Sequence, residues 1–306
     1  MKIVITGATG FIGRKLVAQL LAEGHEVGAL TRNLETARTR LPVGCAGYVW
    51  HPASGPDAAV IRNLDAIVHL AGEGVADRRW TPARKDAIRA SRVLSTRALV
   101  GAITALPPEA RPRALISASA VGYYGDRGDE PLDEGSAPGD GFLAEVCQAW
   151  EHEALAAQHL GVRTGVVRIG VVLGAEGGVL QKMLPPFRLG LGGRLGTGRQ
   201  WMSWIHADDL VNLFISVIGN ANVGGAVNGV APTPVTNAAF TAALGHVLHR
   251  PTVLAVPAVA LRLALGEMSA ILLASERVLP RAAERLGVTF RYPHIAGALA
   301  DLCAKS

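Results

Sequence analysis

The sequence predicts an α/β fold with a doubly wound parallel sheet, a smaller mixed region and a C-terminal helical module. Three observations lead to this prediction. Short apolar runs alternate with amphipathic helical stretches over residues 1–172, as expected for strands buried on both faces of a parallel sheet. A glycine-rich turn joins the first run to the first helix. Proline-bounded helices begin near residue 251.

The chain divides into three parts. Residues 1–172 are the expected core around the sheet. Residues 173–250 are richer in glycine and proline, and we expect a substrate-binding region there, interleaved with the core. Residues 251–306 are the expected small helical module. The expected strands of the core are residues 2–6, 25–30, 66–71, 114–119 and 162–170, and its helices include residues 11–24, 89–99 and 141–151.

Composition excludes several classes of function. With 49% hydrophobic and 18% charged residues, the 306-residue chain can build a large core. The net charge of +5 comes without a lysine/arginine run, so we expect no nucleic-acid partner. Cys45, Cys147 and Cys303 are too scattered for a disulfide framework or a metal site. Without a signal-peptide pattern or an uninterrupted apolar span, we expect a cytoplasmic protein that does not contact membranes.

The turn KIVITGATGFIG is the strongest signal in the chain. Its three glycines lie between the strand at residues 2–6 and an amphipathic helix. Glycine lets the backbone approach a pyrophosphate closely, and the free N–H groups at the helix start favour an anion. The turn therefore predicts a Rossmann-type dinucleotide site, with contacts from Gly7, Thr9, Gly10, Phe11, Ile12 and Gly13.

The end of the second strand indicates which dinucleotide is bound. It reads ALTRN, with Thr31 and Arg32 and no acid before Glu35. A carboxylate here would bind the ribose hydroxyls of NAD, whereas a guanidinium can bind the 2′-phosphate of NADP. We therefore expect NADP, with Arg32 on the 2′-phosphate. The alternative is a solvated surface arginine.

Four segments together resemble the extended short-chain dehydrogenases/reductases, which include nucleotide-sugar epimerases. They are TGATGFIG (6–13), LDAIVHLAG (64–72), SAS…YYG (117–125) and WIHADD (204–209). Residues 170–193, GVVLGAEGGVLQKMLPPFRLGLGG, resemble the atypical "epimerase family" branch, which carries a C-terminal module of unknown function. The resemblance implies a Rossmann core, which we expect to bind NADP because of Arg32. It also implies cofactor contacts from Asp65 near the adenine, from Leu70, Ala71 and Gly72 beside the pyrophosphate and ribose, and from Val171 and Val172 at the nicotinamide.

The resemblance also exposes a gap in the catalytic residues. The wider family uses a serine, a tyrosine with a lysine four residues later, and an asparagine on the preceding helix. Ser119 matches the serine. If Glu151 matches the glutamate that commonly follows the lysine, then Cys147 stands in the lysine position and leucine replaces the tyrosine. Arg92 stands where the asparagine is usual.

Three residues are candidates for the missing chemistry. Arg92 can act as an electrostatic group or a cofactor ligand, because a guanidinium keeps its proton. Cys147 can act as acid/base, nucleophile or redox thiol if Arg92 or an oxidised nicotinamide lowers its pKa, or it is a small core residue. Tyr124 (or Tyr123) is the better candidate proton donor by chemistry, although the family's tyrosine in this segment more often lines the substrate pocket.

Two functions are compatible with this pattern. The first is an NADP(H)-dependent oxidoreductase or epimerase with an altered site, acting on a small sugar-like or carbonyl compound. The second is a non-catalytic NADP(H)-binding sensor or scaffold. Ser119 and the elaborate segment 192–204 favour the first, and the missing tyrosine/lysine pair favours the second. A homodimer is compatible with either.

Overall fold

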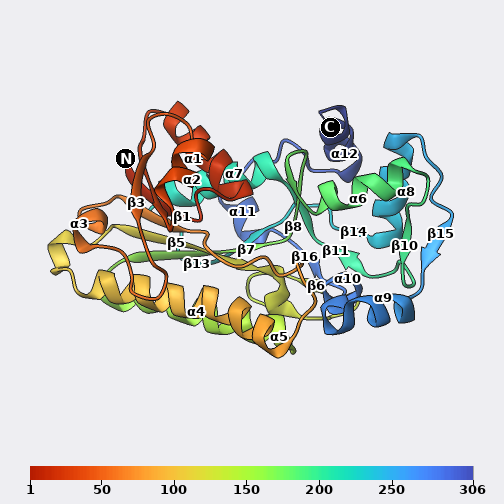
Figure 1. Ribbon diagram of the computed structural model, residues 1–306, viewed down its shortest axis with the longest axis horizontal. Coiled ribbons are helices and arrows are strands. Elements are labelled where there is room, and N and C mark those ends of the chain that lie inside the picture. Colours follow the sequence, from red (N-terminus) through yellow and green to blue (C-terminus); the bar gives the residue numbers. More distant parts are fainter. Residues whose placement is uncertain (306) are drawn as a thin grey trace.

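The computed structural model describes residues 1–305, and its centre is a seven-stranded sheet in which every neighbouring pair is parallel (Figure 1). The strand order is β13-β7-β5-β4-β1-β2-β3. This order confirms the predicted doubly wound sheet. The strands are β1 (Lys2–Thr6), β2 (Glu26–Thr31), β3 (Ala46–Val49), β4 (Ala66–His69), β5 (Ala114–Ala120), β7 (Arg163–Ile169) and β13 (Gly225–Gly229).

Helices cover both faces of the sheet (Figure 1). On one face lie α1 (Phe11–Ala22), α2 (Leu34–Arg40), α7 (Ala207–Gly219) and α11 (Arg281–Arg285). On the other lie α3 (Ala58–Ile61), α4 (Pro82–Thr104) and α5 (Phe142–Leu155). Alternate residues of β1 serve the two cores, since Ile3 and Ile5 pack with α1 and α7 while Val4 packs with α4.

Within the seven-stranded sheet, the sequence missed β3 and β13 and predicted too late an end for β4. All four residues of β3 are exposed, and β13 contains two glycines, so neither shows the apolar run that predicts a buried strand. Strand β4 ends at His69 rather than at residue 71. The reason is that the Thr6 hydroxyl accepts hydrogen bonds from the backbone N–H groups of Leu70 and Ala71 at 3.1 and 3.2 Å.

A smaller lobe continues from the sheet with its own core. Its mixed three-stranded sheet pairs β8 (Val171–Gly174) in parallel with β12 (Trp204–His206) and antiparallel with β9 (Gly177–Gly178). Leu173, Trp204, Phe240 and Leu299 form the centre of this second core. The other elements of the lobe are α6 (Val179–Arg188), β10 (Gly193–Leu195), β11 (Trp201–Met202), β14 (Val235–Thr236), α8 (Asn237–Leu248) and α12 (Ile295–Ala304).

The sequence predicted a helical module at the C-terminus, but this segment also contains strands. Besides α9 (Ala258–Leu265) and α10 (Ala270–Leu273), it contributes β15 (Leu254–Val256), which pairs with β10, and β16 (Arg277–Val278), which pairs with β6 (Pro131–Leu132). The segment is therefore hydrogen-bonded to both other parts of the chain. None of the helices in residues 1–305 combines the length and apolar composition that a membrane-spanning helix needs.

Two glycines of the segment 170–193, Gly174 and Gly177, form a cradle for Phe11, the first residue of α1. A Cβ atom added at Gly174 would lie 2.1 Å from the Phe11 ring, and one at Gly177 would lie 2.7 Å from it. The small lobe thus holds the start of α1, the helix that follows the glycine turn.

This cradle generates a matched pair of predictions. Gly174→Ala should lower the free energy of unfolding by about 1–3 kcal/mol, because the Phe11 ring must move. Gly101→Ala, inside α4 with no neighbour within 4 Å, should instead raise it by up to about 1 kcal/mol through helix propensity. Urea denaturation of both variants measures the two changes. Equal stability of Gly174→Ala and the unaltered protein would show that Phe11 is not held this way.

Candidate functional site

A cavity of about 260 Å³ lies at the carboxyl edge of β1, β2 and β4. It collects predicted cofactor residues from all three strand ends, as the carboxyl edge of an open α/β sheet commonly does. Residues that we had not singled out complete its wall. The cavity is lined by Gly7, Thr9, Gly10, Leu30, Thr31, Arg32, Trp50, Pro52, Leu70, Ala71, Gly72, Glu73 and Ser91.

The glycine turn has the geometry that a pyrophosphate requires. Gly7 has φ +68°, and a Cβ there would lie 2.8 Å from the carbonyl of Leu70. A Cβ at Gly13 would lie 2.3 Å from the Gly7 oxygen. The backbone N–H groups of Phe11 and Ile12 find no acceptor within residues 1–305. A backbone this close to the cavity, with free N–H groups at a helix start, fits the phosphates of a dinucleotide.

Arg32 follows β2 and lines the cavity, which is the place expected for a residue that binds the 2′-phosphate of NADP. The Thr31 hydroxyl and the Asn33 backbone hydrogen-bond each other, and the Asn33 side chain caps α2 by accepting from the N–H of Thr36. This tight turn presents Arg32 at the cavity, exposed and without a hydrogen bond or ion pair in residues 1–305. The arrangement fits NADP.

Asp65 is not near the adenine position, so that expectation was wrong. It precedes β4 and therefore lies at the amino edge of the sheet, across from the glycine turn. Its carboxylate accepts from the Lys2 N–H at 2.7 Å and pairs with Arg113 at 3.2 Å. Trp50, which follows β3 and lines the cavity, was missed because β3 itself was missed.

Val171 and Val172 begin β8, directly beyond β7. Both are half-buried and pair in register with Trp204 and Ile205 of β12. Neither lines the cavity described above. Their contact with a nicotinamide stays a prediction.

Ser119, the penultimate residue of β5, belongs to a buried network of charged side chains. Its hydroxyl donates to Glu151 at 2.7 Å, and Glu151 also accepts two hydrogen bonds from Arg168, at 2.8 and 2.9 Å. Burial opposes the charge on Arg168, but hydrogen bonding to Glu151 outweighs it and raises the pKa of the guanidinium. The only sequence signal for Arg168 was a charged residue inside an apolar strand.

Tyr124 closes the short 3-10 turn Val121–Tyr124 and is fully buried. Its hydroxyl donates to Asn228 at 2.8 Å and accepts from Arg168 at 2.9 Å. Burial raises the pKa of Tyr124 to about 12, against the opposing effect of Arg168. Its one proton is already donated inside the protein, which favours a structural role over the proton transfer that we had considered.

Cys147 lies on α5 against Ser119, buried to 4% exposure. In the sequence, Arg92 or an oxidised nicotinamide was considered as a group that could lower its pKa. Burial and the charge of Glu151 instead raise the pKa to about 12, although Ser119, Arg92 and the backbone N–H of Ala120 oppose the rise. Cys147 is therefore a neutral thiol at physiological pH in this structure.

Arg92 reaches from α4 to the boundary between the cavity and α5. It donates to the carbonyl of Glu73 at 2.9 Å and lies 5.3 Å from the Trp150 ring centre. A Cβ at Gly72 would be 3.3 Å from its guanidinium carbon. Burial lowers the pKa of Arg92, while Cys147 and Glu73 oppose this, and a guanidinium keeps its charge in proteins. Arg92 thus supplies a cation next to the lysine position.

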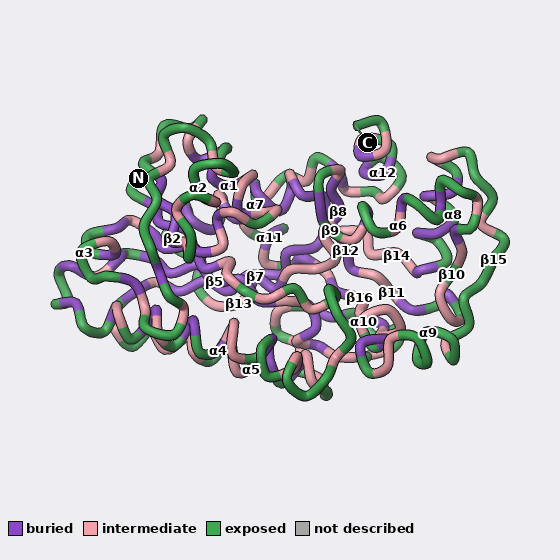
Figure 2. The backbone as a smooth tube through the Cα atoms, in the orientation of Figure 1, coloured by how far each residue is buried: buried purple, intermediate pink, exposed green. Residues whose placement is uncertain are grey.

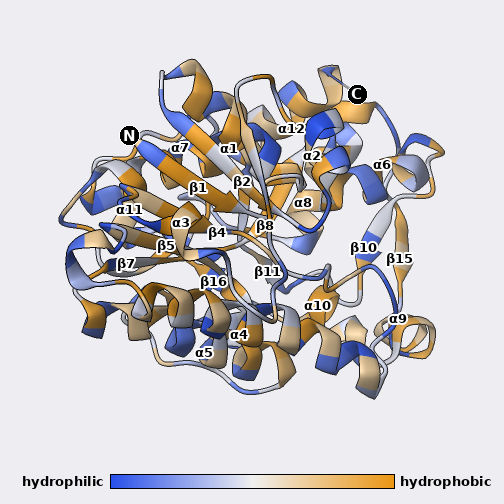
Figure 3. Cartoon of the chain, turned by 60° about the vertical axis from the view of Figure 1, so that its left-hand side comes forward, coloured by the Kyte–Doolittle hydropathy of each residue, from blue (hydrophilic) through white to orange (hydrophobic). Residues whose placement is uncertain are grey.

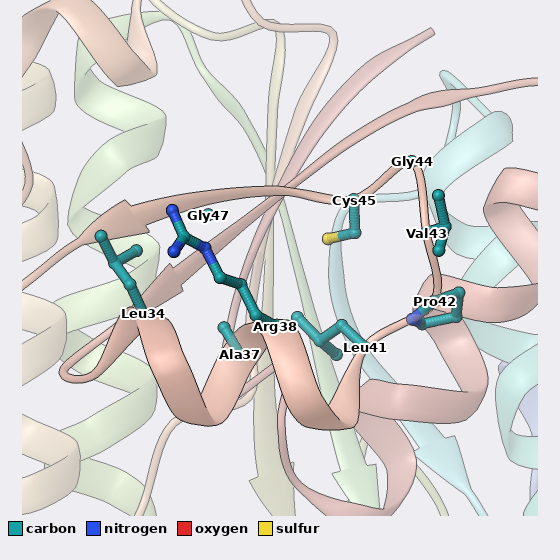
Figure 4. Close-up of a pocket in the computed structure, with 9 residues that line it drawn as sticks. All are labelled: Leu34, Ala37, Arg38, Leu41, Pro42, Val43, Gly44, Cys45 and Gly47. Atoms are coloured by element: carbon teal, nitrogen blue, oxygen red, sulfur yellow. The ribbon is translucent and has the colours of Figure 1, made fainter.

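A second cavity of about 290 Å³ lies between α2 and β3 (Figure 4). Its wall includes Leu34, Leu41, Cys45 and the side chain of Arg38. It contains no residue of the glycine turn and none of the catalytic candidates, so it is separate from the candidate site.

Comparison with known protein families gives two matches. A profile described as "NAD dependent epimerase/dehydratase family" matches residues 3–229, and one described as "Domain of unknown function (DUF1731)" matches residues 256–302. The chain is 43% identical over 299 residues to the epimerase family protein SDR39U1 homolog, chloroplastic, of Arabidopsis thaliana, covering 98% of this chain and 86% of that protein. It is 42% identical to epimerase family protein Mb2239 of Mycobacterium bovis, covering 97% and 96%.

Solved structures that resemble this chain are also described as epimerases. The human epimerase family protein SDR39U1 (isoform 2), crystallised with NADPH, has a TM-score of 0.86 and 33% identity, with 100% of both chains covered. A nucleoside-diphosphate sugar epimerase from Corynebacterium glutamicum has a TM-score of 0.77 and 39% identity, covering 98% of this chain and 57% of that chain.

The state of Cys147 can be tested by alkylation. With a pKa of about 12, roughly one thiol in 10⁴ is a thiolate at pH 8, so iodoacetamide should label Cys147 at least about a hundredfold more slowly than free cysteine. Its labelling rate should keep rising from pH 7 to pH 10, because a higher pH is needed to remove the proton. Mass spectrometry of the labelled peptides measures both, with half-buried Cys303 as internal reference. A rate that levels off near pH 7 would mean an activated thiolate.

Proposed function

The chain belongs to the NAD-dependent epimerase/dehydratase family, and we propose that it binds NADP(H) for oxidoreductase or epimerase chemistry on a small carbonyl or hydroxyl compound, sugar-like compounds included. The observation that carries the cofactor assignment is Arg32, an exposed guanidinium without an ion pair in residues 1–305, on the same cavity as the glycine turn. When bound, the nicotinamide supplies or accepts the hydride. The human relative crystallised with NADPH supports NADP(H) over NAD(H).

Each group of residues around the cavity would bind a different part of the cofactor. Gly7, Gly10 and the free N–H groups of Phe11 and Ile12 would hold the pyrophosphate. Arg32 would bind the 2′-phosphate with paired, charge-assisted hydrogen bonds. Arg92, beside Gly72, would lie towards the reacting end and stabilise negative charge on a substrate oxygen or a cofactor hydroxyl.

The polarity of Ser119 constrains the substrate. Because its hydroxyl proton goes to Glu151, the free lone pairs of its oxygen can only accept a hydrogen bond. A ligand group that faces Ser119 must therefore donate, as an alcohol does and a ketone does not. This supports a hydroxyl-bearing compound such as a sugar.

The second candidate function is a non-catalytic NADP(H)-binding sensor or scaffold. It is favoured by the same network, because the hydroxyl protons of Ser119 and Tyr124 are both donated within the protein. A sensor needs the cofactor contacts and no proton donor.

Turnover separates the two functions. The purified protein is mixed with NADPH and a panel of small aldehydes, ketones and ketoses, and with NADP⁺ and the corresponding alcohols, while the absorbance of the reduced nicotinamide is followed. We expect a change with a hydroxyl-bearing member of the panel. NADPH binding by calorimetry with no absorbance change across the panel favours the sensor, and absence of NADPH binding refutes both.

Arg32 gives a sharper test of cofactor choice. Arg32→Ala should raise the NADPH dissociation constant about 10- to 100-fold, because a charge-assisted contact contributes about 1.5–3 kcal/mol. NADH, which has no 2′-phosphate, should bind the variant and the unaltered protein equally. Isothermal titration calorimetry measures both, and Arg40→Ala, exposed at the other end of α2, is the control. Parallel losses for both cofactors would refute the assigned role.

A further inference from the structure

The far end of the small lobe exposes large apolar side chains. We call residues 188–195 and 249–265 the tip. Val253, Leu263 and Leu189 are 87%, 75% and 74% exposed. Figure 2 shows β15 and α9 as largely exposed, and Figure 3 shows β15 in the apolar colour. The exposed apolar side chains of the tip are Leu189, Leu191, Val253, Leu254, Val256, Val259 and Leu263.

The tip brings these side chains together from separate segments. Strands β10 and β15 form a two-stranded sheet in which Arg194 is opposite Ala255. Helix α9 follows β15, and its residues Val259 and Leu263 are exposed four positions apart while Leu261 is buried. In Figure 1 β15 lies at one end of the long axis of the molecule, across from α3. The apolar residues thus sit on a projecting end of the molecule.

The charges of the tip have one sign. Residues 177–207 and 210–266 contain no aspartate or glutamate. Arg194 and Arg262 are exposed and have no ion pair in residues 1–305, and the Arg250 guanidinium donates only to backbone carbonyls. The nearest acid along the chain, Glu267, is paired with Lys85 at 2.6 Å. The surface is therefore apolar and positively charged.

The apolar and positively charged character of the tip indicates which kind of partner can bind there. A second copy docked tip to tip would bring the four arginines of one tip against the four of the other, which like-charge repulsion opposes. An acidic amphipathic helix needs a groove, and neither cavity described above contains a tip residue. A projecting apolar end surrounded by arginines is complementary to a lipid bilayer, which has anionic headgroups at its surface and apolar acyl chains below them.

We propose that the tip docks on the surface of an anionic lipid bilayer. The apolar side chains of β15 and α9 would enter the boundary between headgroups and acyl chains, and Arg194, Arg250 and Arg262 would contact the anionic headgroups. This replaces our expectation of no membrane contact, which rested on the lack of a spanning segment. Peripheral docking needs no such segment.

Vesicle co-sedimentation of the full chain tests the proposal. The protein should pellet with vesicles of phosphatidylcholine and phosphatidylglycerol at 7:3, and about tenfold less with pure phosphatidylcholine or at 0.5 M NaCl. The double variant Val259→Asp/Leu263→Asp should lose at least about tenfold in partitioning. Leu94→Asp, an exposed leucine on α4 away from the tip, should bind like the unaltered protein.

Two further measurements keep the result interpretable. Calorimetric NADPH binding checks that the variants are folded, since the tip lies outside the cofactor cavity. Light scattering after gel filtration reports the oligomeric state. Failure of the unaltered protein to bind anionic vesicles, or equal binding by the double variant, overturns the proposal. A dimer that the double variant converts to monomer, without vesicle binding, assigns the tip to a second copy instead.

Discussion

The ion pair between Glu151 and Arg168 is the constraint around which the site is built. Taking both charges out of water is costly, and the two direct hydrogen bonds offset this cost together with the contacts to Ser119 and Tyr124 and the stacking of Arg168 on the Tyr123 ring. Removing one partner of such a pair typically costs about 3–5 kcal/mol. The pair ties α5 to β7, and through Tyr124 and Asn228 it reaches β13 and the carbonyl of Leu279 in the C-terminal segment. In the same pair, Glu151 accepts the hydrogen bond of the Ser119 hydroxyl, and Arg168 donates a hydrogen bond to the Tyr124 oxygen.

The positive charge of the site lies on a different helix from the one that carries it in the family pattern. The family places its cation on the helix after the serine strand, where this chain has Cys147 on α5. Here Arg92 approaches from α4 and lies within electrostatic range of the Cys147 thiol. A lysine at 147 would put two cations together at a buried position, which like-charge repulsion penalises. The small neutral side chain at position 147 and the arginine at position 92 therefore depend on each other. Together they keep a positive charge at the site although the lysine is absent.

The sequence predicted what depends on local pattern and missed what depends on packing. The glycine turn and Arg32 could be assigned to one site from the sequence because each lies just after a strand, and the structure places both at one cavity. Asp65 was misplaced although its position before β4 already put it at the amino edge of a parallel sheet. The state of Cys147 could not be predicted, because its pKa depends on burial and on Glu151, and burial is a property of the packed structure. Ser119 and Glu151 are 32 positions apart, and no sequence pattern shows that one hydroxyl points at the other.

A hydride transfer also moves a proton, and the described groups limit where that proton can come from. Arg92 does not release one. The Tyr124 hydroxyl donates its hydrogen bond to Asn228, and the Ser119 hydroxyl donates its hydrogen bond to Glu151, so neither hydroxyl hydrogen points at a ligand. Cys147 retains a proton, but its raised pKa makes it a weak acid. In the oxidation direction, by contrast, an alcohol can donate a hydrogen bond to the Ser119 oxygen, whose own hydroxyl hydrogen is directed at Glu151. The hydrogen-bond polarity of the site therefore favours a ligand that brings its own hydroxyl proton, and disfavours a carbonyl that needs one supplied.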